Sequence, residues 1–373
     1  MQILPSPHVP AYGALAPEGV DRVRGDQWHL RYLKVAVAHR ISQGEGVTVA
    51  VPDTGVAPHP DLSANLLPGI NLLVKGSGDG QQDRNSHGTG MAGLIAAHGH
   101  HGNKGALGLA PRAKILPIIS SAENNEGDAD RLAQAIEFAI GAGADVISIS
   151  SSGGSSQRLR QAVNAAQSAN VIVVAAAGNS PGDAAVGYPA SEADVIAVGG
   201  IDRNGERAAV SVIGPQIDVV APAVDIYSTS IDGKYRKGTG TSDATAIVAG
   251  AAALIRSKYP YLPASEVAHR LTATAVDKGP PGRDDEYGYG VIDLVAALTT
   301  DVPPLGFGSA TASAPATGAP TTTAAAHPGD DGDRGATVRG WVTLGVLVAG
   351  GTAWALIARH RRRSDDPPPR ISH

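Results

Sequence analysis

Residues 47–62 read VTVAVPDTGVAPHPDL, and their first five residues form an apolar run that begins with three β-branched side chains in a row. Continuous rather than alternating apolar runs are typical of strands buried on both faces of a parallel sheet. Similar runs recur at 145–149, 171–174 and 195–198. Between and after these runs lie Ala-rich stretches with helical character, at 131–140, 157–168, 243–257 and 264–273. The pattern predicts a doubly wound α/β fold with a mostly parallel central sheet flanked by helices.

The composition limits the classes of function. The chain has 373 residues, of which 42% are hydrophobic, so it is long enough for one large α/β core or two smaller ones. The formal net charge of −5 provides no electrostatic argument for nucleic-acid binding. The absence of cysteine excludes disulfides, a cysteine nucleophile and cysteine-ligated metals.

Three polar residues stand where such a fold places its functional groups. Asp53 ends the first apolar run, His87 opens a small-residue helix in NSHGTGMAGLIAAH, and Ser242 opens another in GTGTSDATAIVAG. Taken singly, a hydroxyl before a helix is often an N-cap, and a lone histidine is usually structural. Together they predict nucleophilic catalysis, because serine needs an imidazole to remove its proton, and the imidazole needs a carboxylate to fix its tautomer.

The chain resembles the subtilisin-like serine peptidases between QWHL near residue 27 and YGYGVIDLVAAL ending at 298. The resemblance rests on collinear motifs, among them DTGV, HPDL, HGTGMAG, AAAGN, YPA, VIAVGG and GTSDATAIVAGAAAL. The order aspartate, histidine, serine is also that of subtilisin. A lipase or esterase is disfavoured, because no G-x-S-x-G motif surrounds Ser242.

The resemblance implies a role for each matching residue. Asp53 would orient His87, His87 would act as general base and then general acid, and Ser242 would attack the peptide carbonyl. The Asn179 side chain and the Ser242 backbone N–H would form the oxyanion hole. The implied substrate is a polypeptide, paired along one strand edge and held beside a pocket wall; the edge residues are Ser150, Ser151, Ser152 and Gly153, and the wall residues are Ala175, Ala176, Ala177 and Gly178.

Two positions depart from the family pattern. Pro52 stands where relatives usually have a branched apolar residue, and Ala246 replaces a proline four residues after the nucleophile. Proline removes a ladder donor, so we expect Pro52 to end the ladder one residue early while leaving Asp53 correctly aimed. The alternative is a shifted Asp53 and a weakened enzyme. Alanine suits a helix interior, so the change at 246 should be tolerated.

No cofactor or metal is predicted. The HGHHGNKG stretch contains His98, His100 and His101 in a Gly-rich loop without a paired carboxylate, so metal binding is disfavoured there. The GDDGD stretch at 329–333 resembles a calcium loop only in composition, because its spacing is wrong.

The C-terminal part of the chain predicts a membrane anchor. Residues 301–339 form a linker rich in Pro, Thr and Ala that cannot bury enough surface to fold. Residues 340–358, GWVTLGVLVAGGTAWALIA, carry no charge and would reach roughly 28 Å as a helix, close to one bilayer core. The basic tail, residues 359–373, is predicted to be cytoplasmic and the peptidase domain, 27–300, extracytoplasmic. The N-terminal extension, 1–26, shows no signal-peptide pattern, so this orientation requires an export signal upstream of residue 1 or an unconventional one.

The whole architecture resembles the mycosins, membrane-anchored subtilisin-like peptidases associated with type VII secretion in actinobacteria. That resemblance implies secretion-complex subunits as partners. The alternative function is a weakly active or inactive peptidase-fold scaffold in such a complex; a damaged triad would mark it, and apart from Pro52 the sequence shows none.

Overall fold

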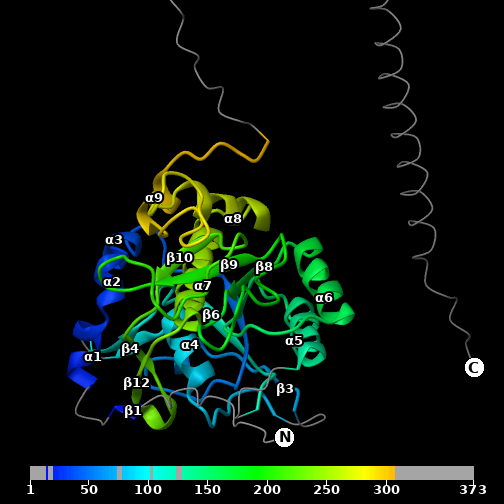
Figure 1. The fold of residues 1–373 in the computed structure, drawn as a ribbon. Coiled ribbons are helices and arrows are strands. Elements are labelled where there is room, and N and C mark those ends of the chain that lie inside the picture. The colour runs from blue at the N-terminus through cyan, green and yellow to red at the C-terminus, as the bar shows by residue number, and fades with distance from the viewer. Residues whose placement is uncertain (1–13, 16–19, 74–77, 101–103, 123–127, 307–373) are drawn as a thin grey trace, which may run out of the picture. The chain divides into compact units, whose positions relative to one another are not determined.

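The centre of the fold is a sheet of parallel strands in the order β10-β9-β8-β7-β2-β6-β3 (Figure 1). The computed structural model describes residues 14–15, 20–73, 78–100, 104–122 and 128–306. The strands of this sheet are β2 (Thr48–Asp53), β3 (Ile70–Asn71), β6 (Lys114–Ile119), β7 (Val146–Ile149), β8 (Ile172–Ala176), β9 (Ile196–Ile201) and β10 (Val219–Pro222). The predicted mostly parallel α/β fold is confirmed.

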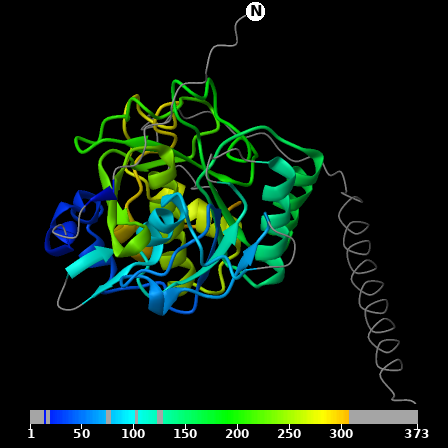
Figure 2. The same ribbon diagram turned by 90° about the horizontal axis from the view of Figure 1, so that it is seen from below.

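Helices cover both faces of the sheet (Figures 1 and 2). On one face lie α4 (His87–Ala96) and α7 (Thr241–Lys258), with α8 (Ala264–Ala273) and α9 (Leu294–Thr299) packed against α7. On the other face lie α5 (Ala129–Gly141) and α6 (Gln157–Ser168), which pack on each other. Successive strand residues therefore enter opposite cores: Val49 packs with α4 and α7, whereas Ala50 packs with α5 and α6.

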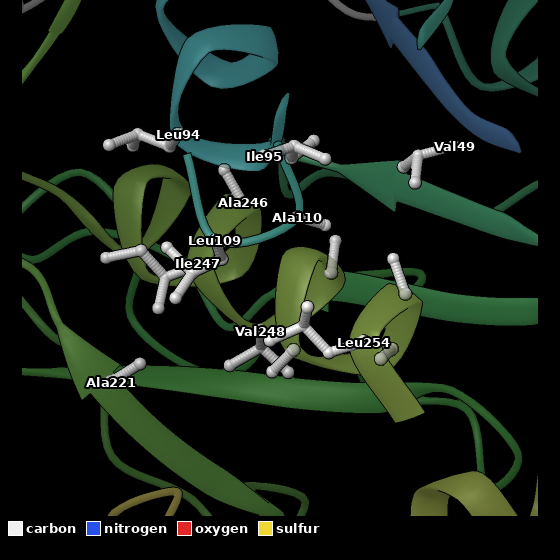
Figure 3. Close-up of a cluster of buried hydrophobic side chains, with 14 of the residues drawn as sticks. Val49, Leu94, Ile95, Leu109, Ala110, Ala221, Ala246, Ile247, Val248 and Leu254 are labelled. Carbon is white, nitrogen blue, oxygen red and sulfur yellow. The ribbon is translucent and has the colours of Figure 1, made fainter. Parts of the chain in front are cut away.

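The α7 helix is a core element throughout most of its length, because its residues 241–256 are all buried. Its small and branched side chains pack against α4 and the sheet, as Figure 3 shows for Ala246, Ile247 and Val248. Ala246 is fully buried inside the helix, and the helix continues without interruption through this position. The predicted tolerance of alanine at 246 agrees with this arrangement.

The prediction that Pro52 ends the strand ladder is wrong. β2 runs through Pro52 to Asp53, and its register with β6 pairs Pro52 with Ile118 and Asp53 with Ile119. Only the pairing with β7 stops early, after Ala50. Proline is accommodated because it occupies the penultimate residue of the strand, where one neighbour has already diverged and the other tolerates the missing donor.

Two smaller sheets extend the face that carries α4 and α7. β12 (Tyr235–Gly238) pairs antiparallel with β1 (Ala14–Leu15) and with β11 (Ile226–Thr229), and β4 (His98–His100) pairs with β5 (Lys104–Leu107). β11 packs on α4, so β12 lies one strand away from the helix that begins with His87. The remaining elements are α1 (Val20–Asp26), α2 (Trp28–Tyr32), α3 (Val35–Ala38) and the 3-10 turns η2 (Ser63–Asn65) and η3 (Ile231–Gly233).

The predicted membrane span 340–358, the tail 359–373 and the linker beyond residue 306 lie outside the described residues. Within the described part of the chain, no helix has the length and apolar character needed to cross a membrane.

Candidate active site

Asp53 and His87 meet at the C-terminal edge of the central sheet. The imidazole Nδ1 of His87 lies 2.8 Å from Oδ1 and 2.9 Å from Oδ2 of Asp53. Both side chains are almost fully buried, with exposed fractions of 2% for His87 and 6% for Asp53. The backbone amide of Thr54 also donates to Asp53 Oδ1, at 2.7 Å. A buried carboxylate held in this way fixes the imidazole tautomer that leaves Nε2 available as a base.

The start of α4 is built around a carboxylate that the sequence did not single out. Asp83 Oδ1 accepts from the backbone amide of Ser86, and Asp83 Oδ2 accepts from both the amide and the hydroxyl of Thr89. The Thr54 hydroxyl donates to the same carboxylate, at 2.9 Å. Ser86 has a left-handed φ of 77°, which is strained for a serine. Asp83 thus holds the turn that aims His87 at Asp53.

Ser242 is the second residue of α7, where helix amides point outward and the helix dipole favours negative charge. Its hydroxyl donates to the backbone carbonyl of Ser150, at 2.9 Å, and its exposed fraction is 6%. In return, the Ser150 hydroxyl donates to the Ser242 carbonyl, at 3.3 Å. The start of α7 and the end of β7 are therefore joined at this residue pair.

Asn179 is oriented by the residue before Ser242. Its Oδ1 atom accepts from the Thr241 backbone amide, at 2.9 Å, and from the Thr241 hydroxyl, at 3.2 Å. Because Oδ1 is the acceptor in both contacts, the Nδ2 group is left as the donor of this amide. Gly178, just before it, has a left-handed φ of 121°, and a Cβ there would come within 2.8 Å of Asp183 Oδ2. Only glycine fits this close approach.

The predicted substrate edge is connected to Asn179 through Asp183. Its Oδ2 atom accepts from the Asn179 backbone N–H, at 2.7 Å, and from the Ser152 hydroxyl, at 3.0 Å. Gly153 exchanges backbone hydrogen bonds of 3.0 and 2.9 Å with Tyr188. Of the predicted edge, Ser150 is buried and Ser151 and Gly153 are exposed; of the predicted wall, Ala175, Ala176 and Ala177 are buried. Because both backbone groups of Gly153 pair with Tyr188, this residue does not offer a free edge to an extended chain.

Sequence reasoning missed Asp83, Thr241 and Asp183. A local signal existed for Thr241, which adjoins the nucleophile candidate, and for Asp83, which stands four residues before His87. Asp183 offers none, because it lies in a short polar loop and its function depends on Ser152, 31 residues earlier.

The histidine stretch at 98–105 does have a carboxylate partner, contrary to the sequence-based interpretation. His100 Nδ1 bonds to Asp61, which is fully buried and also accepts from the Tyr235 hydroxyl, at 2.9 Å, and the Ala106 amide, at 2.7 Å. The distant partner explains the error, because Asp61 precedes His100 by 39 residues. Among the residues that the structure describes, no group of three or more His, Asp or Glu side chains is arranged to hold a metal ion. His101 lies outside the described residues.

The fold and this edge of the sheet define a subtilisin-like class of hydrolase, and comparison with known proteins agrees. Residues 44–290 match the model of the subtilase family, Peptidase S8. The chain belongs to the subtilase family and is a serine endopeptidase.

Among curated proteins, the chain is similar to a thermostable alkaline protease of Halalkalibacterium halodurans, with 39% identity over 71% of each chain. It is equally similar to subtilisin DY of Bacillus licheniformis, with 39% identity over 75% of this chain and 98% of the relative.

Several solved structures of mycosins are similar to this chain. One is MycP1 from Mycobacterium smegmatis, with a TM-score of 0.69, 29% identity and coverage of 79% of this chain and 89% of that one. Another is a MycP1 described as an essential component of the type VII (ESX-1) secretion system, with a TM-score of 0.70 and 33% identity over 78% and 93%. A third, MycP3 from the type VII (ESX-3) secretion system, has a TM-score of 0.65 and 32% identity over 74% and 88%.

Proposed function

We propose that this peptidase hydrolyses peptide bonds through an acyl-enzyme, with Ser242 as nucleophile, His87 as general base and then general acid, and Asp53 as the carboxylate that stabilises the imidazolium. The observation that carries the proposal is the contact of His87 Nδ1 with both oxygens of Asp53, at 2.8 and 2.9 Å, at the start of a helix that packs against α7. This geometry supports proton transfer from the Ser242 hydroxyl to Nε2.

The oxyanion of the tetrahedral intermediate is proposed to lie between Asn179 Nδ2 and the Ser242 backbone N–H. The contacts of Thr241 with Asn179 Oδ1 support this, because they direct the amide donors away from Thr241. Donors held in place before the reaction need no reorganisation when the charge develops.

Substrate binding is proposed to release the nucleophile. The Ser242 hydroxyl donates to the Ser150 carbonyl. An extended peptide paired along residues 150–152 would offer its own backbone N–H to that carbonyl. The Ser242 hydroxyl would then turn toward His87, so a peptide seated in register would itself favour the reactive arrangement.

The location and partners are also proposals. The uncharged span 340–358 and the basic tail after it support a single membrane anchor, with the peptidase domain outside the cytoplasm and the C-terminus inside. The similarity to MycP1 and MycP3 supports an association with subunits of a type VII secretion system.

Labelling with a fluorophosphonate probe tests the catalytic proposal on the full-length chain. We expect covalent labelling of the wild-type protein and none of Ser242→Ala, with His87→Ala and Asp53→Ala strongly reduced. Ser155→Ala, which changes an exposed serine near the proposed edge, is the matched control and should label normally. A folded wild-type chain that never labels would favour the scaffold function instead.

Carbonate extraction of membranes tests the anchor. The full-length chain should stay in the membrane pellet, and Leu347→Lys, which places a charge at the centre of the predicted span, should weaken that retention. Complete extraction of the wild-type chain by carbonate would exclude a spanning anchor.

A further inference from the structure

A buried ion pair adjoins the proposed nucleophile. Asp243 follows Ser242 in α7, has an exposed fraction of 0%, and its carboxylate oxygens accept no hydrogen bond from the described part of the chain. Its counter-charge is Arg236 on β12, whose Nη1 atom lies 3.6 Å from Asp243 Oδ1. The free-energy cost of removing two charges from water often exceeds the gain from their attraction. A contribution to stability therefore does not by itself explain why this pair is buried.

Two glycines make room for this pair. A Cβ at Gly90 on α4 would collide with the Arg236 side chain: it would meet the guanidinium and come within 2.7 Å of Cδ. A Cβ at Gly238 on β12 would come within 2.7 Å of Asp243 Oδ2 and would also collide with the guanidinium. The pair therefore occupies a fitted space between α4, α7 and β12.

This space lies between the two helices that carry the proposed catalytic groups. Gly90 is three residues after His87, nearly one turn along α4, and Asp243 is one residue after Ser242. Arg236 thus contacts the helix of the base and pairs with the neighbour of the nucleophile. Burial raises the pKa of the Asp243 carboxyl above its ordinary value, and the charges of Arg236 and of a protonated His87 oppose that rise.

The other charged groups at this edge have different contacts. Asp53 on β2 contacts His87 Nδ1, and Asp83, in the loop before α4, is bound to Thr54 and Thr89. Asp243 is therefore a further carboxylate, from a third element, whose charge interacts with the imidazole of His87.

We propose that Asp243 and Arg236 are positioning residues that act through His87. The Asp243 carboxylate stabilises the imidazolium that forms when His87 takes the Ser242 proton, and the positive charge of Arg236 offsets part of that stabilisation and limits the negative field of the carboxylate at the oxyanion. The proton passes from Ser242 Oγ to His87 and then to the leaving amine, and Asp243 neither gains nor loses one. The inference rests on the proposed function.

Paired charge-neutralising substitutions in the full-length chain test this role. We expect Asp243→Asn to move the acidic limb of the kcat/KM profile to lower pH, and Arg236→Gln to move it to higher pH. Each shift should be about half a pH unit or more, because the charges act across a buried, weakly screened space. The two substitutions disrupt the same ion pair, so a purely structural role would not give shifts of opposite sign. If one variant fails to fold, the direction in which the acidic limb moves in the other variant still tests the role of the pair.

Titration of the His87 imidazole by NMR, in a Ser242→Ala background, provides a readout that needs no turnover. Its midpoint should move in the same two directions. Arg236→Lys, which keeps the charge, should restore the wild-type profile. Asp218→Asn removes a partly buried carboxylate at the opposite edge of the sheet and should move neither readout.

Unchanged midpoints in both variants, or shifts in the same direction, would overturn the inference. If the wild-type chain cleaves no peptide, the catalytic proposal fails, but the NMR titration still decides the role of Asp243.

Discussion

The Ser152 hydroxyl donates to Asp183 Oδ2 at 3.0 Å, and the same oxygen accepts from the Asn179 backbone N–H. One carboxylate therefore joins the proposed substrate edge to the residue that is proposed to bind the oxyanion. The Ser152 side chain also lies close to Gly187, where a Cβ would come within 2.8 Å of Ser152 Cβ.

We expect Asp183→Ala to reduce kcat/KM by about 10-fold or more, because it removes the acceptor of two hydrogen bonds and leaves the Asn179 backbone N–H unsatisfied. Ser152→Ala, which removes only one of the two donors, should cost about two- to five-fold. Steady-state hydrolysis of a peptide substrate measures both, and Ser155→Ala is the control. Equal effects of the first two variants would mean that Asp183 acts on the edge alone.

The Thr241 hydroxyl should matter for kcat more than for KM. Thr241→Val removes the 3.2 Å contact with Asn179 Oδ1 but keeps the backbone contact, so we expect a loss of about five- to ten-fold in kcat. Asn179→Ala, which removes the proposed donor itself, should cost about 100- to 1,000-fold. Thr241→Ser retains the hydroxyl and should behave as wild type. A rise in KM with kcat unchanged would contradict a role in the transition state.

Pro52 should not limit activity. Since β2 stays paired with β6 through Asp53, and Asp53 reaches His87, we expect Pro52→Ile to change kcat/KM by less than about three-fold. Asp53→Asn is the reference for a lost orientation and should reduce kcat by about 10⁴-fold. A greatly increased activity of Pro52→Ile would show that the proline had displaced the aspartate.

Much of the fold could be predicted because the strands of a parallel sheet are continuous apolar runs. The runs at 47–51, 145–149, 171–174 and 195–198 correspond to β2, β7, β8 and β9, with ends that differ by a few residues. β6 was missed, because Lys114 and Pro117 interrupt its apolar pattern. Strand order also could not be predicted, since uniformly apolar strands carry little information about their neighbours.

The site residues, too, could be predicted only where the local sequence identifies them. Asp53, His87 and Ser242 were found because each stands at the end of a recognisable element, within a glycine-rich motif. Asp183 and Asp243 were not, because an aspartate in a loop or in the first turn of a helix is ordinary on the surface. What distinguishes them is their contacts with Ser152 and Arg236, residues from other parts of the chain.

His29 is the clearest source of acid sensitivity in the described structure. It lies in α2 with an exposed fraction of 0%, and neither ring nitrogen has a hydrogen-bond partner among the described residues. Burial lowers the pKa of this imidazole from 6.5 to about 3, with a smaller effect from the charge of Arg31. The folded protein therefore keeps His29 neutral at pH values where the unfolded chain binds a proton.

Because the unfolded state alone takes up this proton between about pH 3 and 6.5, the free energy of unfolding should fall as the pH is lowered through that range. The contribution of His29 is about 1.4 kcal/mol for each pH unit. Urea unfolding at pH 7.5 and pH 5 should show a smaller loss for His29→Phe than for the wild-type chain, by about 2 kcal/mol. His269→Phe, at a partly exposed histidine in α8, should lose as much stability as wild type. An equal pH dependence of His29→Phe and wild type would show that the imidazole becomes protonated within the folded state, by local opening of α2.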